Sequence, residues 1–197
     1  MKENGWIKGL VSVKNFTTLP PLIDNSIGHS LDDFIILSEI GRGSSGIVYK
    51  VQSKKNNAIY ALKSISLKHV KVKRNLLQEI KMLKALKHPN IIEYYGSFMS
   101  EDSLCIVTEF AEYGDLRTKI KIQKAKFKRI SEKEIWTIAS QIALGLLHLH
   151  SHQILHRDIK TLNIVLTKEN KVKLGDLGES AFIDKEKLTK GKSLNSI

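Results

Sequence analysis

Three glycines, Gly41, Gly43 and Gly46, stand within the stretch GRGSSGIVYKV at residues 41–51. Glycine has no Cβ, so backbone N–H groups can approach a ligand closely, and successive N–H groups form concavities that bind anions. The dinucleotide-binding version of G-x-G-x-x-G needs a helix directly after its last glycine, but here the β-prone run IVYKV follows. The spacing therefore places the glycines at the tip of a β-hairpin, which is either a lid over a triphosphate or a plain surface turn.

Further motifs with charged and oxygen-bearing side chains follow this hairpin. They are Y-A-L-K at residues 60–63, H-R-D at residues 156–158 with Asn163, and D-L-G at residues 176–178. Together with the glycine stretch they occur in the order typical of protein kinases. The resemblance covers about residues 34–180, and HRDIKTLNIVL, LCIVTEFAEYGDL and DLG are most similar to the NIMA-related serine/threonine kinases.

The resemblance implies transfer of the ATP γ-phosphoryl group to serine or threonine hydroxyls of protein substrates. Asp158 is then the expected catalytic base, and Lys160 is the cation that neutralises the transferred phosphoryl group. Lys63 is expected to hold the α- and β-phosphates of ATP. Glu79, on a helix expected over residues 73–86, is its expected ion-pair partner.

Asn163 and Asp176 carry the hard oxygen atoms that Mg²⁺ prefers, and the resemblance makes them the metal ligands. His156 is expected to be structural and to pack behind this metal-binding loop, where Leu177 replaces the phenylalanine of most kinases. Arg157 is expected to pair with a phosphate on the activation loop. The candidate acceptors of that phosphate are Thr189, Ser193 and Ser196.

The resemblance also assigns the residues around ATP. The glycine loop and the strands and linker beside it supply Ile40, Gly41, Arg42, Gly43, Ser44, Ser45, Gly46, Ile47, Val48, Ala61, Lys63, Thr108, Glu109, Ala111 and Val165. The apolar members sandwich the adenine, backbone groups of residues 109–111 bind its edge, and Thr108 guards a deeper pocket. Ser45 stands where many kinases have an aromatic residue, which is expected to loosen the lid without removing a phosphate contact.

Hydrophobic periodicity predicts the elements that position these side chains. Residues 34–40, 47–51, 58–63, 91–98 and 104–110 are predicted strands. A capping box, Ser131 with Glu134, begins a long helix whose apolar face continues to Leu149, and short β segments follow. We therefore expect an α+β, two-lobed kinase-like fold: a poorly ordered leader at 1–30, a complete N-lobe of five antiparallel strands and one helix at 31–111, and an incomplete helical C-lobe at 112–197.

Composition narrows the alternatives. The formal charge is +12, but the cations are scattered and the densest run, at residues 119–129, holds only one aromatic residue, so no specific nucleic-acid binding is expected. No apolar run is long enough for a membrane span, and no signal peptide is visible. Cys105 is the only cysteine, which excludes an internal disulfide. A cytoplasmic protein is therefore expected, and composition leaves the oligomeric state open.

One family element is missing from the sequence. Kinases carry an A-P-E motif after the activation loop, whereas the only prolines here are Pro20, Pro21 and Pro89. We therefore expect a C-terminally truncated kinase domain whose long helix lacks part of its apolar cover. Two functions stay open: an ATP- and Mg²⁺-dependent serine/threonine kinase, and a kinase-like module that binds nucleotide or a partner protein without catalysis.

Overall fold

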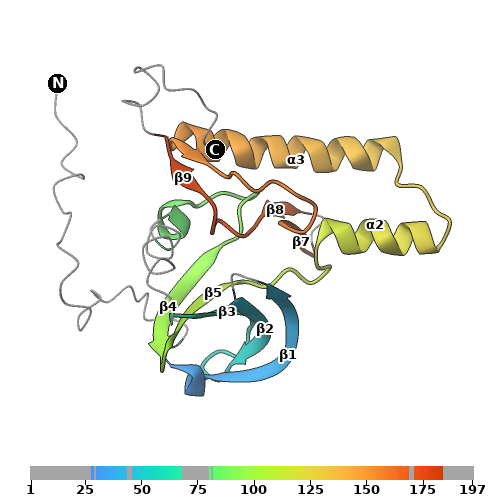
Figure 1. Cartoon of the computed structure of the whole chain (residues 1–197). Helices are drawn as coiled ribbons and strands as arrows, with labels where there is room; N and C mark the ends of the chain where they lie inside the picture. Colours follow the sequence, from blue (N-terminus) through green and yellow to red (C-terminus); the bar gives the residue numbers. More distant parts are fainter. Residues whose placement is uncertain are drawn as a thin grey trace, which may run out of the picture.

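A computed structural model of the chain describes residues 28, 30–43, 46–67, 80, 82–168 and 171–183. The predicted leader, apart from residues 28 and 30, lies outside these residues. The described part consists of a five-stranded sheet and a second region with two helices and two small sheets (Figure 1). Of the helices in this part of the chain, none combines the length and apolar character needed to cross a bilayer.

The large sheet is antiparallel throughout, with strand order β1-β2-β3-β5-β4. Its elements are η1 (Leu31–Asp33), β1 (Phe34–Gly43), β2 (Gly46–Ser53), β3 (Ile59–Ser66), β4 (Tyr94–Ser100) and β5 (Ser103–Glu109). The predicted five-stranded antiparallel sheet is therefore confirmed. β1 and β2 pair as far as Gly43 and Gly46, so the glycine stretch does close a β-hairpin.

Alternation along β3 decides which side chains can reach the second region. Tyr60 and Leu62 are buried in the core on one face of the sheet. Successive side chains of a strand point to opposite faces, so Ala61 and Lys63 lie on the other face. Their partners across the β3–β5 ladder are Thr108 and Ile106 respectively. The sheet thus presents the Lys63 ammonium group and the small side chains of Ala61 and Thr108 toward the second region.

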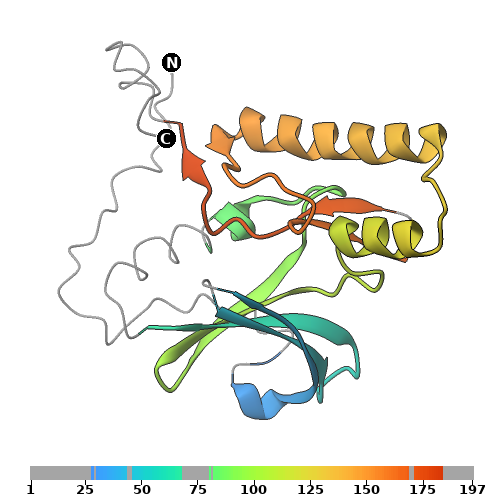
Figure 2. The same cartoon turned by 45° about the vertical axis from the view of Figure 1, so that its right-hand side comes forward.

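The second region contains α2 (Leu116–Ala125), α3 (Glu132–Ser151), β6 (Ile154–Leu155), β7 (Ile164–Leu166), β8 (Val172–Leu174) and β9 (Ala181–Phe182). β7 pairs with β8, and β6 pairs with β9. In Figures 1 and 2 the β7–β8 hairpin lies between the large sheet and α3. One apolar core joins the two regions, because Ile65 and Ile106 of the sheet pack in the same cluster as Leu149 of α3 and Leu174 of β8.

The helices differ in part from their predictions. α2 was not predicted, because its lysines were interpreted as scattered surface charge. The available signal was Asp115, which caps the start of the helix: its carboxylate accepts from the Thr118 N–H at 2.8 Å. At α3, Ser131 accepts from the Glu134 N–H as predicted, at 3.3 Å, while the Glu134 carboxylate pairs with Lys119. Of the helix predicted over residues 73–86, Glu79 and most of the rest lie outside the described residues; Ile80 and residues 82–85 are helical.

The predicted apolar face of α3 is covered from Ile138 to Leu149 but not at the first turn. Leu149 is buried, and Ile138, Ile142 and Leu146 pack against the core. Ile135, at the first turn, is 52% exposed, which agrees with the expectation that the long helix lacks part of its apolar cover. The reason is geometric: β6 and β8 are the strands that contact α3 most, and the first turn extends past them.

The segment before β4 clamps β8 against α3. Ile92 N–H donates to the Leu174 carbonyl and Leu174 N–H to the Asn90 carbonyl, both at 2.9 Å. The Asn90 side chain also donates to the Val172 carbonyl at 2.9 Å and to the Gln141 side chain at 3.0 Å. Gly145 of α3 packs here, because an added Cβ would lie 2.7 Å from the Asn90 carbonyl oxygen and 2.9 Å from the Leu174 Cδ1.

This close approach predicts that Gly145→Ala destabilises the fold. Helix propensity alone favours alanine by about 1 kcal/mol, but the overlap with a backbone carbonyl forces a shift that costs about 1–3 kcal/mol. We expect a net loss in the free energy of unfolding measured with urea. Leu147→Ala, at a 65% exposed position of the same helix, is the control and is expected to change stability little. A Gly145→Ala protein more stable than the native one would show that α3 can move away from Asn90.

Three imidazole rings lie against one another at the C-terminal end of α3. The ring centroids of His88 and His148 are 4.7 Å apart, and those of His148 and His152 are 4.4 Å apart. His148 Nε2 is buried and has no hydrogen-bond partner in the described part of the chain. Burial lowers the pKa of both His88 and His148; the Lys173 charge lowers that of His88 further, and the neighbouring imidazoles lower that of His148. The surroundings of His88 and His148 therefore favour the neutral form of both rings.

Stability is expected to depend on pH through this cluster. The pKa values of His88 and His148 in the folded state lie below the unfolded value of about 6.5. The unfolded chain therefore binds more protons in acid, and the free energy of unfolding falls as the pH drops from about 7 to about 5. His148→Phe keeps an aromatic ring and removes the titration, so it should make this dependence shallower in urea unfolding. His150→Phe, at an exposed position of α3, should not. Equal slopes for the native and His148→Phe proteins would contradict the prediction.

Candidate active site between the two regions

Asp158 lies in the loop between β6 and β7 and has two side-chain partners. Lys160 Nζ lies 2.5 Å from Asp158 Oδ2, and Asn163 Nδ2 donates to both Oδ2 and the backbone carbonyl of Asp158, each at 2.9 Å. The hydrogen bond from Lys160, and then the one from Asn163, lower the pKa of Asp158. Three of the residues predicted for the site therefore form one cluster, with an ionised carboxylate at its centre.

His156 supports the site from behind and uses both of its ring nitrogens. It is 2% exposed, and its Nε2 lies 3.1 Å from the Gly175 carbonyl oxygen. A carbonyl can only accept, so Nε2 carries the proton and Nδ1 is left to accept from the Asp158 N–H at 3.4 Å. Burial lowers the pKa of His156, which keeps the ring neutral. His156 therefore links Gly175 to Asp158, which agrees with the structural role predicted for it behind the metal-binding loop.

The β7–β8 hairpin brings Asp176 beside Asn163. Gly175 N–H donates to the Asn163 carbonyl at 2.8 Å, directly after the β8 strand. Asp176 then adopts a left-handed backbone conformation, with φ of 51°. Its Oδ1 lies 2.8 Å from Lys63 Nζ on β3, and this ion pair connects the sheet to the second region. The Lys63 side chain is 15% exposed and that of Asp176 is 38% exposed, so the lysine is the more enclosed partner.

The predicted ion pair between Lys63 and Glu79 involves a residue outside the described part of the chain. The Lys63 contact with Asp176 was not predicted. The sequence separates the two residues by 113 positions, and no local pattern links them. Lys63 also lies within β3, which runs from Ile59 to Ser66, and not at the strand end where the sequence placed it.

The glycine hairpin lies at the end of β1 and β2, with Ser44 and Ser45 outside the described residues. Gly46 has φ of +128°, and an added Cβ would overlap the Ser64 carbonyl of β3, so only glycine fits there without strain. Arg42 folds back onto Glu39, with Nη2 2.6 Å from Oε2, in an exposed pair. Within the structure the hairpin thus packs against the strand that carries Lys63.

The apolar residues predicted around adenine come from both regions. Ile40 of β1 is 47% exposed, and Val48, Ala61 and Val165 are half-buried. Val165 belongs to β7, which is hydrogen-bonded to the linker after β5 through Tyr113 N–H to Leu166 O at 3.0 Å and Leu166 N–H to Gly114 O at 2.8 Å. These two hydrogen bonds fix β7, and with it Val165, to the linker.

A buried ion pair behind the linker was not predicted. Lys173 of β8 is 8% exposed, and its Nζ lies 2.6 Å from Glu109 Oε2 at the end of β5. The Glu109 N–H donates to the Glu93 carbonyl at 2.9 Å. The only signal in the sequence was a lysine inside the apolar segment KVKL, which is equally typical of an exposed strand position. The pair fixes the linker to the strand that leads into Asp176.

The donor atoms fit a magnesium ion with a nucleotide. The amide nitrogen of Asn163 is bonded to Asp158, which leaves its Oδ1 for a cation, and Asp176 supplies carboxylate oxygens. In the described part of the chain no three His, Cys, Asp or Glu side chains form a metal-binding group. Mg²⁺ bound through one or two side chains and phosphates needs no such group.

A five-stranded antiparallel sheet with a glycine hairpin, joined by a linker to a helical region that carries Asp158, Asn163 and Asp176, is the arrangement of a protein kinase fold. The family model for the protein kinase domain matches residues 34–194, well over half of the chain. The chain therefore belongs to the protein kinase family.

Similar proteins indicate which part of the protein kinase family the chain resembles. The chain is similar to cell division control protein 7 of Schizosaccharomyces pombe, with 40% identity over 74% of the chain and 14% of the relative. It is similar to the mouse serine/threonine-protein kinases Nek3, at 39% over 78% of the chain and 29% of the relative, and Nek4, at 42% over 74% and 18%. The two Nek kinases confirm the resemblance to the NIMA-related serine/threonine kinases. The chain spans less than a third of the length of each of these three relatives.

Proposed function

We propose that the chain is an ATP- and Mg²⁺-dependent serine/threonine kinase module that transfers the γ-phosphoryl group to protein hydroxyls. The observation that carries this proposal is the convergence of two charged clusters on the β7–β8 hairpin. Asp158, Lys160 and Asn163 form one cluster, and Lys63 with Asp176 forms the other. Gly175, bonded to both Asn163 and His156, joins them.

Each side chain has a task that its surroundings support. The lowered pKa of Asp158 keeps it an acceptor, so it can orient the substrate hydroxyl and take its proton as the hydroxyl oxygen bonds to the γ-phosphorus. The bond from phosphorus to the bridging oxygen breaks, and ADP leaves with that electron pair. Lys160 lies beside Asp158 and offsets charge on the transferred group. Lys63, whose Nζ lies 2.8 Å from Asp176 Oδ1, would contact the α- and β-phosphates.

Asn163 and Asp176 would hold Mg²⁺, which neutralises phosphate charge and orients the triphosphate when bound. Ile40, Val48, Ala61 and Val165 would enclose the adenine, while backbone groups of residues 109–111 bind its edge. Thr108, paired with Ala61 across the β3–β5 ladder, would border the deeper end of that site. The glycine hairpin would close over the phosphates.

The test uses the whole chain with ATP radiolabelled on the γ-phosphate and casein as acceptor. Label on phosphoserine and phosphothreonine that disappears with EDTA is the expected result. Thermal shift with Mg-ATP is measured in parallel. A Mg-ATP shift without any transfer would support the module that binds nucleotide and performs no catalysis. No shift and no transfer would overturn the proposal.

A further inference from the structure

A strip of cations covers α2 and the turn that leads into α3. Every charged side chain between Leu116 and Ser131 is basic: Arg117, Lys119, Lys121, Lys124, Lys126, Lys128 and Arg129. All of them are exposed except Lys119, which is half-buried toward α3. We call residues 117–129 the basic strip. The proposed kinase chemistry uses none of them.

Apolar side chains stand out among these cations. Ile120 is 40% exposed, Ile122 is 47% exposed, and Phe127, just after the end of α2, is 99% exposed. Phe127 has φ of 53°, a left-handed conformation that only a few per cent of non-glycine residues adopt. The strip therefore offers both positive charge and apolar contact area to a partner.

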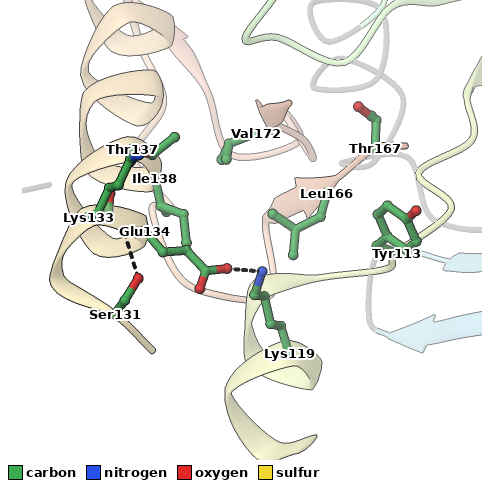
Figure 3. A pocket seen from close by; sticks show the side chains of 10 residues that line it. All are labelled: Tyr113, Lys119, Ser131, Lys133, Glu134, Thr137, Ile138, Leu166, Thr167 and Val172. Atoms are coloured by element: carbon green, nitrogen blue, oxygen red, sulfur yellow. Dashed lines mark hydrogen bonds and ion pairs between the residues drawn. The ribbon is translucent and has the colours of Figure 1, made fainter. Parts of the chain in front are cut away.

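A cavity of about 320 Å³ opens beside the strip, between α2, the first two turns of α3 and the β7–β8 hairpin (Figure 3). Tyr113, Ile138, Leu166 and Val172 supply its apolar wall. The polar residues that line it are Lys119, Ser131, Lys133, Glu134, Thr137 and Thr167. This volume is at the lower end of ligand pockets, about 300–1,000 Å³, and suits one large apolar side chain.

The cavity is separate from the proposed nucleotide site. Leu166 lines it, while the preceding residue, Val165, is the one expected beneath adenine. Consecutive residues of β7 face opposite sides of the strand. A partner could therefore occupy the cavity whether or not nucleotide is bound.

Charge around the cavity favours an acidic occupant. Lys119 is neutralised by an ion pair with Glu134 across the α2–α3 gap. The exposed Lys133 ammonium forms no ion pair with any residue that the structure describes. Lys126, the C-cap residue of α2, follows Lys119 by seven residues, about two helical turns, and so lies on the same side of α2 as Lys119. Among the described residues that line the cavity, the charge that no ion pair compensates is thus the positive charge of Lys133.

We propose that the basic strip and this cavity form a docking surface for an acidic protein segment that places one apolar side chain in the cavity. The concave, apolar wall favours a peptide over a lipid surface, which is too flat to enter it. Single-stranded nucleic acid is disfavoured because Phe127 is the only aromatic residue of the strip and cannot provide successive stacking platforms. The surface lies outside the cleft for chemistry, so the proposal does not depend on the proposed function.

The first test measures fluorescence anisotropy of the whole chain with a fluorescein-labelled nonapeptide, in which a central leucine has four glutamates on each side. Because burial of apolar surface is favourable, a central leucine is expected to bind about 10-fold more tightly than a central alanine, which corresponds to about 1.4 kcal/mol. The double variant Lys126→Glu/Lys133→Glu is expected to bind at least 10-fold more weakly. The control Lys54→Glu/Lys87→Glu carries the same change in net charge at exposed positions away from the strip and should bind like the native chain.

The second test fills the cavity. Thr137 lies on its rim, on the exposed side of α3, so Thr137→Trp should block the cavity while the fold, checked by urea unfolding, is retained. The preference for leucine over alanine is then expected to vanish, whereas Thr137→Ser keeps it. Equal binding of both peptides to the native chain, or equal loss in the strip and control variants, would reduce the surface to nonspecific basic charge and overturn the proposal. Tight binding to phosphatidylserine vesicles that Phe127→Ser abolishes and Thr137→Trp leaves unchanged would assign the strip to membranes and also overturn it.

Discussion

Asp158→Asn is expected to lower the rate of γ-phosphoryl transfer by about 10³-fold, within the range of about 10²–10⁴ for loss of a general base. Asparagine keeps the shape and an acceptor oxygen for Lys160, but it cannot take the substrate proton and carries no charge. Asp158 has a lowered pKa because of the hydrogen bonds from Lys160 and Asn163, so the native side chain acts as the carboxylate throughout the neutral range. The measurement is initial transfer of radiolabel to casein under saturating Mg-ATP.

Two controls separate chemistry from folding and from nucleotide binding. The Asp158–Lys160 pair is partly exposed, so its loss should cost less than about 1 kcal/mol of stability. Mg-ATP affinity should change by less than about threefold, because Asp158 is not proposed to contact either the Mg²⁺ ion or the nucleotide. Asp102→Asn, in the exposed turn between β4 and β5, should retain full activity. Transfer by Asp158→Asn at the native rate would remove Asp158 from the mechanism.

Lys63→Met should produce the second large effect, a loss of about 10²–10³-fold in kcat/KM, as for removal of one electrostatic contact that stabilises a transition state. Methionine retains most of the aliphatic length of the side chain, so packing in β3 is kept. Only the ammonium group, 2.8 Å from Asp176 Oδ1, is lost. Because Asp176 is 38% exposed, water can solvate its carboxylate, and the free energy of unfolding should fall by less than about 1 kcal/mol.

The comparison variant is Lys54→Met, at an exposed turn lysine after β2, which should leave both activity and stability unchanged. Activity is measured by radiolabel transfer, Mg-ATP affinity by calorimetry, and stability by urea unfolding. If Lys63→Met lost several kcal/mol of stability in parallel with activity, the ammonium would be a structural ion of the interface between the two regions. If activity stayed within threefold of the native value, Lys63 would make no contact that matters in transfer.

Local patterns sufficed for much of the fold. β-branched and aromatic runs predicted the strands of the large sheet, and the run IVYKV distinguished a hairpin from a strand–helix turn at the glycines. Those predictions succeed because strand propensity and turn chemistry are properties of neighbouring residues. α2 was not predicted because it has few apolar residues. Its lysines are good helix formers, but they add nothing to an apolar periodic pattern.

The sequence by itself was enough to select the candidate site residues Lys63, Asp158, Asn163 and Asp176, because their motifs occur in a recognisable order. Only the tertiary structure decided which of them touch. It pairs Lys63 with Asp176 and Glu109 with Lys173, and it assembles the cavity beside the basic strip from two helices and a hairpin. The physical reason is distance along the chain: these contacts join segments brought together by burial of one apolar core, and no local propensity specifies the partner of a charge that lies 64 or 113 residues away.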